Sequence, residues 1–485
     1  MTPDHAETLL QSFRDSLAGP DHLARLSAGV IGEGRMIDGG FGPKPLIYAD
    51  YVASGRALRQ VEHFILEEVL PLYANSHTEA STCGAFMTRL RRAGRAAIAR
   101  LCGADASHAV IFCGNGATAG LNRLVTLLGV SGAVARGERP LVLIGPYEHH
   151  SNILPWRESG AEVIEIGEAE TGGPDLGELE RVLRTADPER LVVGAFSALS
   201  NVTGILTGVA AVTALLKRYG ALSVWDYAGG GPYLPIDMGQ GMDAVVVSPH
   251  KFVGGPGASG VLVLRRDAVR ETRPSVPGGG TVRFVSPWGH DYSTDVAVRE
   301  EAGTPNVLGD IRAALAFLVK DAIGQEVMDR RHAALKARAL EVWGNCPEIE
   351  LLGQPQKRHS LPIFSFRIRD MREGGNLHPQ LVTRMLADLH GIQARGGCAC
   401  AGPYAHRLLG LDQDHSEALR QAILSGEEME KPGWTRLNLS VLMSDKKVET
   451  ILGAVAELAR APYPSCLAYE ADPSTARFRV RAEAA

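Results

Sequence analysis

Seven short apolar runs, separated by stretches with helical spacing, constrain the fold of this chain more than any other feature. The runs are residues 110–113, 141–144, 163–166, 191–195, 222–225, 244–247 and 261–264. Short apolar runs bounded by turn signals predict strands covered on both faces, and the helical stretches between them predict parallel pairing. The link before the last run is too short for a crossover helix, so that strand is expected to be antiparallel to its predecessor. The sequence therefore predicts an α/β fold with a mostly parallel, seven-stranded sheet flanked by helices.

With 485 residues, the chain exceeds the usual size of a single domain. A helical pattern over residues 6–17 and a glycine-rich break at 39–43 indicate an N-terminal extension over residues 1–47. The large domain is expected over residues 48–320. One long helical stretch, 311–343, is expected to bridge to a smaller α+β domain within residues 321–485. Its expected elements are strands at 361–368 and 391–394 and a closing helix at 448–459.

The composition is that of an ordinary globular enzyme, with 45% hydrophobic and 22% charged residues. The net charge is −5 without a basic run, so nucleic acids and anionic membranes are poor candidate partners. No apolar stretch reaches the roughly 18 residues of a membrane span, and no signal peptide is visible at the N-terminus. Seven cysteines in a chain of this length do not make a disulfide framework. We therefore expect a cytoplasmic protein with free thiols.

Lys251 stands between two predicted buried strands, in Ser248-Pro249-His250-Lys251. A surface charge explains it poorly, whereas an amine held for Schiff-base chemistry on pyridoxal phosphate (PLP) explains it well. Asp226 lies 25 residues upstream, directly after the run 222–225, and PLP enzymes place such a carboxylate opposite the pyridine nitrogen. The alternative for Asp226 is a helix N-cap. The pair predicts PLP as the cofactor.

Three other segments follow predicted strands, at the edge where open α/β sheets bind ligands. The glycine-rich turn 114–120, which contains Thr118, offers backbone N–H groups and a helix N-terminus to a phosphate, or is only a tight turn. His149, in Glu-His-His-Ser-Asn, could stack on a pyridine ring and relay protons, or be structural. Asn201 could bind the phenolic oxygen of the cofactor, or close a turn.

The segment 395–403 reads Arg-Gly-Gly-Cys-Ala-Cys-Ala-Gly-Pro. Arg395 suits a bidentate clamp on a substrate carboxylate. Cys400 is a candidate reactive thiol, which requires a nearby cation or helix N-terminus. Cys398 would share a face with Cys400 if the segment were extended. A single Cys-x-Cys pair is weak ground for a metal site, and no metal is expected.

Together these motifs resemble the class V aminotransferase family of fold-type I PLP enzymes. They are most similar to the group II cysteine desulfurases and selenocysteine lyases, over about residues 48–459. The resemblance implies cofactor contacts from Ala117, Thr118, His149, Asn201, Asp226, Ser248, His250 and Lys251.

The resemblance also assigns the remaining site residues. It makes Cys400 the sulfur-accepting cysteine and pairs Arg395 with Arg436 as active-site arginines, with His77 near an active-site histidine. Thr304, in the segment 299–306, is implied to reach the partner's cofactor phosphate across a dimer interface.

The sequence departs from the family pattern at two places near the expected site. Gly229 stands where a glutamine contacts the cofactor, and Cys398 replaces a histidine. Residues 50–54 and 75–78 are also similar to the PLP domain of molybdenum-cofactor sulfurases. These departures affect the expected identity of the substrate more than the expected binding of PLP.

The leading hypothesis is PLP-dependent desulfuration of L-cysteine to alanine. Lys251 and His149 move the Cα proton, and Cys400 takes the sulfur as a persulfide, which passes to an acceptor protein or thiol. A homodimer is expected. One alternative is another class V reaction that does not use Cys400: C–S β-lyase, selenocysteine lyase, aminotransferase or decarboxylase. The other is a catalytically silent scaffold.

Overall fold

The computed structural model describes residues 3–76, 78–463 and 465–481. The chain forms two compact units. Unit 1 comprises the residues up to Ile31, Ser54–Leu199 and Thr207–Gln325. Unit 2 comprises Gly32–Ala53, Ser200–Leu206 and the residues from Glu326 onward. The expected extension, 1–47, is thus shared between the two units.

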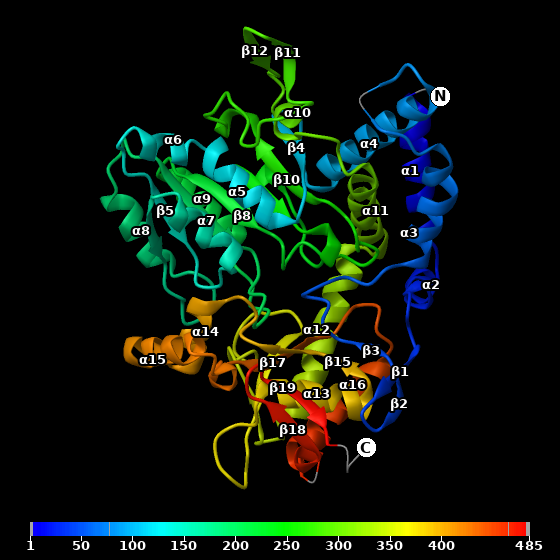
Figure 1. The fold of residues 1–485 in the computed structure, drawn as a ribbon, viewed down its shortest axis with the longest axis vertical. Coiled ribbons are helices and arrows are strands. Elements are labelled where there is room, and N and C mark those ends of the chain that lie inside the picture. Colours follow the sequence, from blue (N-terminus) through cyan, green and yellow to red (C-terminus); the bar gives the residue numbers. More distant parts are fainter. Residues whose placement is uncertain (1–2, 77, 464, 482–485) are drawn as a thin grey trace. The chain divides into compact units, whose positions relative to one another are not determined.

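Unit 1 is built on one seven-stranded sheet with the strand order β4-β10-β9-β8-β7-β5-β6 (Figure 1). The strands are β4 (His108–Cys113), β5 (Leu141–Ile144), β6 (Glu162–Glu165), β7 (Val192–Ser197), β8 (Leu222–Asp226), β9 (Ala244–Val247) and β10 (Gly260–Arg265). β10 is antiparallel to both of its neighbours, and the other neighbouring pairs are parallel. The predicted α/β class, the mostly parallel sheet and the antiparallel last strand are confirmed.

The central strands of this sheet are buried on both faces, which explains why their sequences are largely apolar, whereas the edge strand β6 is only partly buried. Along β5, Leu141 and Leu143 pack in one core cluster, whereas Val142 and Ile144 pack in the other. The first cluster is covered by α4 (Thr82–Leu101), α8 (Leu176–Thr185), α9 (Val209–Arg218) and α11 (Val307–Ile323). The second is covered by α5 (Ala117–Leu127), α6 (Val130–Ala135), α7 (Leu154–Glu158) and α10 (Val296–Glu300).

The prediction of one continuous helix over 311–343 is wrong in one respect. The segment forms two helices, α11 and α12 (Gln325–Trp343), which meet at Gly324. Gly324 has φ +85°, a left-handed backbone that ends an α-helix and that glycine adopts without steric cost. A glycine within an otherwise helical pattern was therefore the signal for this break.

The N-terminal part of unit 1 is helical. α1 (Pro3–Leu17) confirms the helix predicted at 6–17 and contacts α4 and α11. α2 (His22–Gly29) and α3 (Arg59–Phe64) follow. Later in the chain, after β10, β11 (Val282–Ser286) and β12 (Gly289–Tyr292) form a hairpin that projects from unit 1 (Figure 1).

Unit 2 contains an antiparallel sheet with the order β13-β14-β17-β16. Its strands are β13 (Ile349–Leu351), β14 (Ile363–Ile368), β16 (Arg395–Gly397) and β17 (Trp434–Asn438). β15 (Ile392–Gln393) pairs in parallel with β3 (Ile47–Tyr48), which draws this N-terminal segment into unit 2. The strands predicted at 361–368 and 391–394 are confirmed within a few residues.

The helices of unit 2 are α12 beyond its first residue, α13 (Pro379–His390), α14 (Gly402–Leu409), α15 (Gln413–Leu424) and α16 (Asp445–Arg460). α16 confirms the predicted closing helix. Two hairpins complete the unit: β1 (Met36–Gly39) with β2 (Gly42–Pro45), and β18 (Tyr469–Asp472) with β19 (Arg477–Val480). In the described part of the chain, no helix combines the length and apolarity that a bilayer span requires.

Candidate active site

The predicted cofactor residues of unit 1 follow strands that end at one edge of the sheet. Ser197, the last residue of β7, lies opposite Asp226, the last residue of β8. Lys251 follows β9, the next strand, and His149 follows β5 on the other side of β7. Side chains from four neighbouring strands are therefore positioned at the carboxyl edge, where open α/β sheets bind ligands.

The carboxyl group of Asp226 is buried, and one of its oxygens accepts a hydrogen bond from the Ala228 N–H at 2.7 Å. Burial raises the pKa of this carboxyl, and the Ala228 N–H and the positive charge of Lys251 partly offset the rise. Asp226 closes a turn, but no helix begins here, so the N-cap alternative is wrong.

His149 is held by its neighbour Ser151. The Ser151 backbone N–H donates to Nδ1 of His149 at 3.1 Å. Because a backbone N–H can only donate, the neutral imidazole carries its proton on Nε2. The Ser151 hydroxyl lies 3.0 Å from the same Nδ1 and 2.7 Å from Oγ1 of Thr118. Ser151 thus links the predicted ring-stacking histidine to the predicted phosphate loop.

The turn before α5 is shaped by a close approach of the Lys251 segment. The Ala117 N–H donates to Oγ of Ser248 at 2.9 Å. Gly116 has φ +70°, and a Cβ there would lie 2.8 Å from both Ser248 Oγ and His250 Cε1, so only glycine fits. α5 has no side-chain cap at Gly116. Beyond the Ala117 N–H, the N-terminal end of α5 and the exposed Thr118 are therefore suited to an anion.

These residues fit PLP. The cofactor needs a buried carboxylate for its pyridine nitrogen, an amine for its aldehyde and donors for its phosphate. Asp226, Lys251 and the N-terminus of α5 are of these three kinds and come from the same sheet edge. A protonated pyridine nitrogen would also offset the buried charge of Asp226. Among the described residues, no three His, Cys, Asp or Glu side chains gather as a metal site would require.

Glu148 is a buried carboxyl that the sequence reasoning missed. It accepts hydrogen bonds from the Ser197 N–H at 2.8 Å, the Ser197 hydroxyl at 2.6 Å and Nδ2 of Asn152 at 2.5 Å. Burial raises its pKa to about 7; these hydrogen bonds oppose the rise, and the negative charge of Asp226 adds to it. Glu148 therefore ties the loop that carries His149 to the end of β7. Its position directly before His149 was the available signal.

In unit 2, Asp50 joins the two predicted active-site arginines. Its oxygens accept from Nη2 of Arg436 at 2.9 Å and from Nε of Arg395 at 2.8 Å. The Arg436 side chain is 4% exposed, whereas that of Arg395 is 50% exposed. Arg436 also donates to the backbone oxygen of Asn201 at 2.9 Å. The sequence pattern did not indicate this role of Asp50, because the link joins residues hundreds of positions apart.

The loop with the two cysteines is a tight turn, so the condition under which Cys398 and Cys400 would share a face, an extended segment, is not met. Ala399 and Cys400 have φ +56° and +55°, and the Ala401 N–H donates to the Cys398 carbonyl at 3.3 Å. A non-glycine residue in the left-handed region costs about 1–2 kcal/mol. The turn is held by Nδ2 of Asn201, which donates to the Ala399 carbonyl at 2.9 Å.

Asn201 therefore contacts the cysteine turn through Nδ2, whereas its side-chain oxygen, Oδ1, does not take part in this contact. Oδ1 of Asn201 is buried and has no hydrogen-bond partner among the described residues. A buried acceptor without a donor is costly and is typical of a ligand contact. This orphaned oxygen is the feature of unit 2 that best fits a hydroxyl-bearing cofactor.

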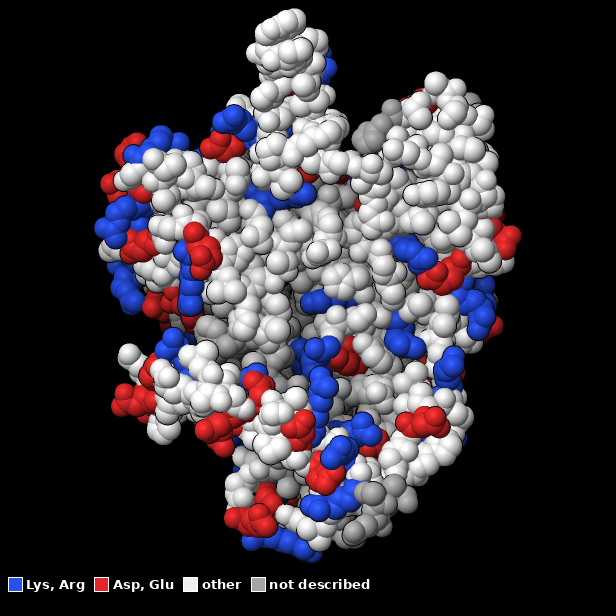
Figure 2. Space-filling view, in the orientation of Figure 1, with Lys and Arg blue, Asp and Glu red and all other residues white. Residues whose placement is uncertain are grey.

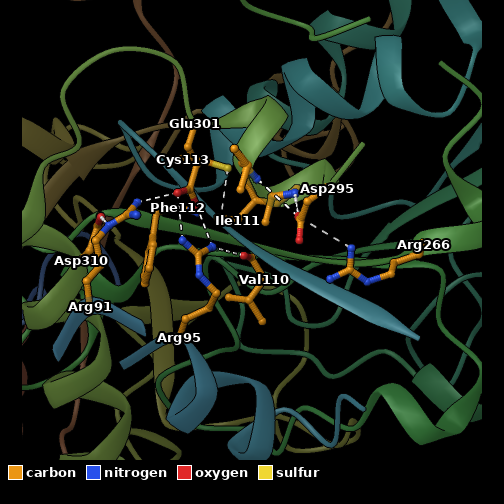
Figure 3. Close-up of polar contacts among 12 residues, drawn as sticks. Arg91, Arg95, Val110, Ile111, Phe112, Cys113, Arg266, Asp295, Glu301 and Asp310 are labelled. Atoms are coloured by element: carbon orange, nitrogen blue, oxygen red, sulfur yellow. Dashed lines mark hydrogen bonds and ion pairs between the residues drawn. The ribbon is translucent and has the colours of Figure 1, made fainter. Parts of the chain in front are cut away.

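A charged network anchors the segment that precedes Thr304 (Figure 3). Both oxygens of Glu301 accept from Arg95 at 2.8 Å, and one also accepts from the Phe112 N–H at 2.8 Å. Arg91 bridges Glu301 to the buried Asp310. Burial raises the pKa of Glu301, but Arg95 and Arg91 outweigh it and hold the pKa below the usual value.

Thr304 lies three residues beyond this anchor and is exposed. Asn306 then caps α11 by accepting from the Gly309 N–H at 3.1 Å. Thr304 is thus presented outward from a segment fixed on both sides. His77 lies outside the residues that the structure describes.

The chain belongs to the aminotransferase class-V family, whose model matches residues 47–425. A cysteine desulfurase of Pectobacterium atrosepticum is 31% identical over 366 residues, 74% of this chain and 85% of that protein. A probable cysteine desulfurase of Aeropyrum pernix is 30% identical over 371 residues, 73% of this chain and 85% of that protein. The apo structure of a cysteine desulfurase from Thermococcus onnurineus matches with a TM-score of 0.69 at 25% identity, covering 86% of this chain and 95% of that one.

The family and fold-type I architecture expected from the sequence are confirmed. Enzymes of this family use PLP, which acts as an electron sink for the substrate Cα when it is bound.

Proposed function

We propose that this protein is a cysteine desulfurase, which takes the sulfur of L-cysteine onto Cys400 and leaves alanine. The observation that carries the proposal is the position of Cys400, exposed on a fixed turn in the same loop as Arg395. The names of the relatives support it, since those at 30–31% identity are cysteine desulfurases. Other class V reactions have no use for an exposed thiol in this loop.

In unit 1, the residues hold the cofactor and move a proton. Asp226 would hold the pyridine nitrogen of PLP, and the N-terminus of α5, with Ala117, Thr118, Ser248 and His250, would hold its phosphate. Lys251 would hold the aldehyde group and would move the proton of the substrate Cα. His149 would contact the cofactor ring and assist this proton transfer with its Nε2–H. Acid–base catalysis of this kind contributes about 10²–10⁴-fold to the rate.

In unit 2, the residues hold the substrate and take its sulfur. Arg395 and Arg436 would bind the substrate carboxylate, with His77 as a further substrate contact, and Asn201 would bind the phenolic oxygen of the cofactor. The thiolate of Cys400 attacks the substrate sulfur. A bond forms between the two sulfurs as the substrate C–S bond breaks. The electron pair of the broken bond remains with the carbon, which takes a proton to become the methyl group of alanine.

The persulfide then needs an acceptor, which we propose to be a partner protein or a small thiol. The enzyme would work in the cytoplasm, where its seven free thiols stay reduced. We also keep, as a proposal, a functional division into a PLP-binding part over 48–320 and a smaller part over 321–485, preceded by the extension 1–47.

We propose that the active form is a homodimer. The tip of the β11–β12 hairpin exposes three large apolar side chains: Phe284 (58%), Val285 (63%) and Trp288 (92%). Figure 2 shows the projecting tip almost free of charged side chains. A second copy of this chain is the occupant that we propose for it. Thr304 follows on the same connection, and in the dimer it would contact the partner's cofactor phosphate.

The test is product analysis with L-cysteine and the Cys400→Ser variant. We expect one alanine for each sulfur removed by the wild-type holoenzyme, and a loss of at least about 100-fold in Cys400→Ser. Cys83→Ser is the matched control, because that partly buried thiol lies on α4. Pyruvate as the product would indicate β-elimination. A keto acid that retains the sulfur would indicate transamination, and release of carbon dioxide would indicate decarboxylation. Unchanged turnover in Cys400→Ser would eliminate the persulfide mechanism.

A further inference from the structure

The two cysteines of the active-site loop are held in a fixed turn. β16 ends at Gly397, directly before Cys398, and α14 begins at Gly402, directly after the turn. The Ala401 N–H donates to the Cys398 carbonyl, and Asn201 donates to the carbonyl between the cysteines. The spacing of the two thiols is therefore set by the turn.

The backbone of the turn sets the expected separation of the two Cα atoms. Ala399, the residue between the cysteines, has left-handed helical φ. The parameters of an α-helix, or of its mirror image, place Cα atoms two residues apart at about 5.4 Å. Disulfides span Cα separations of about 4.4–6.8 Å. A fully extended chain would instead give about 6.7 Å, at the limit of that range. The Cα separation of such a turn thus lies within the disulfide range, and a bridge requires the two side chains to turn toward each other.

The other described cysteines of unit 2 have different neighbours. Cys346 is buried and donates to Glu348, and Cys466 lies against the sulfur of Met385. Cys398 is partly buried and Cys400 is exposed in the same turn. Among the described cysteines of unit 2, Cys398 is therefore the one that shares a turn with Cys400.

We propose that Cys398 is a resolving thiol, which discharges the persulfide on Cys400 as sulfide. The thiolate of Cys398 attacks the inner sulfur of the persulfide. A bond forms between the Sγ atoms of Cys398 and Cys400, and the outer sulfur leaves with the electron pair as HS⁻. The sulfane sulfur gains two electrons, and the two thiols lose two as they form a disulfide.

This inference rests on the proposed function for the source of the persulfide. The disulfide must be reduced before the next turnover, and the reductant is a small thiol or a protein dithiol of the thioredoxin kind. The sulfur would then leave as free sulfide, which a subsequent sulfur-assimilating or sulfide-oxidising reaction would consume. Attack on the inner sulfur is favoured because the Cα separation expected of such a turn suits a bridge of two sulfurs.

The test follows the tryptic peptide 396–407, which contains both cysteines and no others. Sulfur is loaded onto the holoenzyme in the absence of reductant, either with L-cysteine or with inorganic polysulfide. The mass of the peptide is then followed over time by mass spectrometry. In the wild type we expect a peptide about 2 Da lighter than the dithiol, with one sulfide released per disulfide. In Cys398→Ser we expect a peptide about 32 Da heavier, with sulfide released at least about tenfold more slowly. Cys83→Ser should behave as the wild type.

The two loading routes separate this inference from the proposed function. If L-cysteine yields no alanine, the desulfurase proposal fails. Formation of the disulfide after polysulfide loading would still support the role of Cys398. If a persulfide on Cys400 persists equally in the wild type and in Cys398→Ser, by whichever route it is loaded, Cys398 is not a resolving thiol. Failure of both routes to produce the lighter peptide in the wild type would equally overturn the inference.

Discussion

The Asp50→Asn variant tests whether the buried carboxylate organises the two arginines. Asp50 accepts from Arg436 at 2.9 Å and from Arg395 at 2.8 Å, and the substitution keeps its shape while it removes the charge. The Arg436 side chain is 4% exposed, and leaving one partner of such a buried pair without its counter-charge costs about 3–5 kcal/mol. Arg395 is 50% exposed, so losing its pair adds only about 0–1 kcal/mol.

Because the asparagine oxygen still accepts one hydrogen bond, we expect the lower end of this range, about 3 kcal/mol. The measurement is the free energy of unfolding in urea, for the transition that includes unit 2. The matched control is Glu350→Gln, which breaks the half-exposed pair with Arg367 in the same unit and should cost about 1 kcal/mol or less. The KM for L-cysteine should rise in Asp50→Asn and not in the control. Equal losses of stability in the two variants would refute the reasoning.

Two further predictions concern buried carboxyls of unit 1. The pKa of Glu148 is about 7 in the folded state, against about 4.5 in the unfolded state. The folded state therefore binds this proton more tightly. As the pH rises between these two values, the free energy of unfolding of the wild type falls by up to about 3 kcal/mol. Glu148→Gln should lack this slope; urea unfolding between pH 5 and pH 8 checks it, and parallel curves would contradict it. For Glu301, the lowered folded pKa means that its contribution is present above the unfolded pKa and disappears as the pH falls through the folded one. Glu301→Gln should therefore cost about 3 kcal/mol at pH 7 and progressively less in acid, whereas a loss independent of pH would contradict the charged network.

The fold could be predicted from local patterns because its strands are buried on both faces. Most strands are short, largely apolar runs, and the short link before β10 indicated its direction. The break at Gly324 was missed because the apolar pattern continues on both sides of it. The assignment of Gly32–Ala53 to unit 2 could not be foreseen, since it depends on pairing between β3 and β15, more than 300 residues away.

The candidate site was predictable where the residues lie next to strand ends. Lys251, Asp226 and His149 follow strands whose order in the sheet places them along one edge. Side chains that act through long-range contacts were missed. Asp50 meets Arg436 across 386 positions, and Glu148 meets Ser197 across 49. The left-handed turn at Cys398 was also unpredictable, because alanine and cysteine rarely adopt that backbone.

The central claim is that the amine of Lys251 binds PLP. The most direct measurement is borohydride reduction of the holoenzyme followed by mass spectrometry of the peptide that contains Lys251. The account predicts a reduced phosphopyridoxyl group on Lys251, absent from Lys251→Ala treated in the same way. Holoenzyme that carries no adduct at position 251, or carries it on a different lysine, would contradict the account.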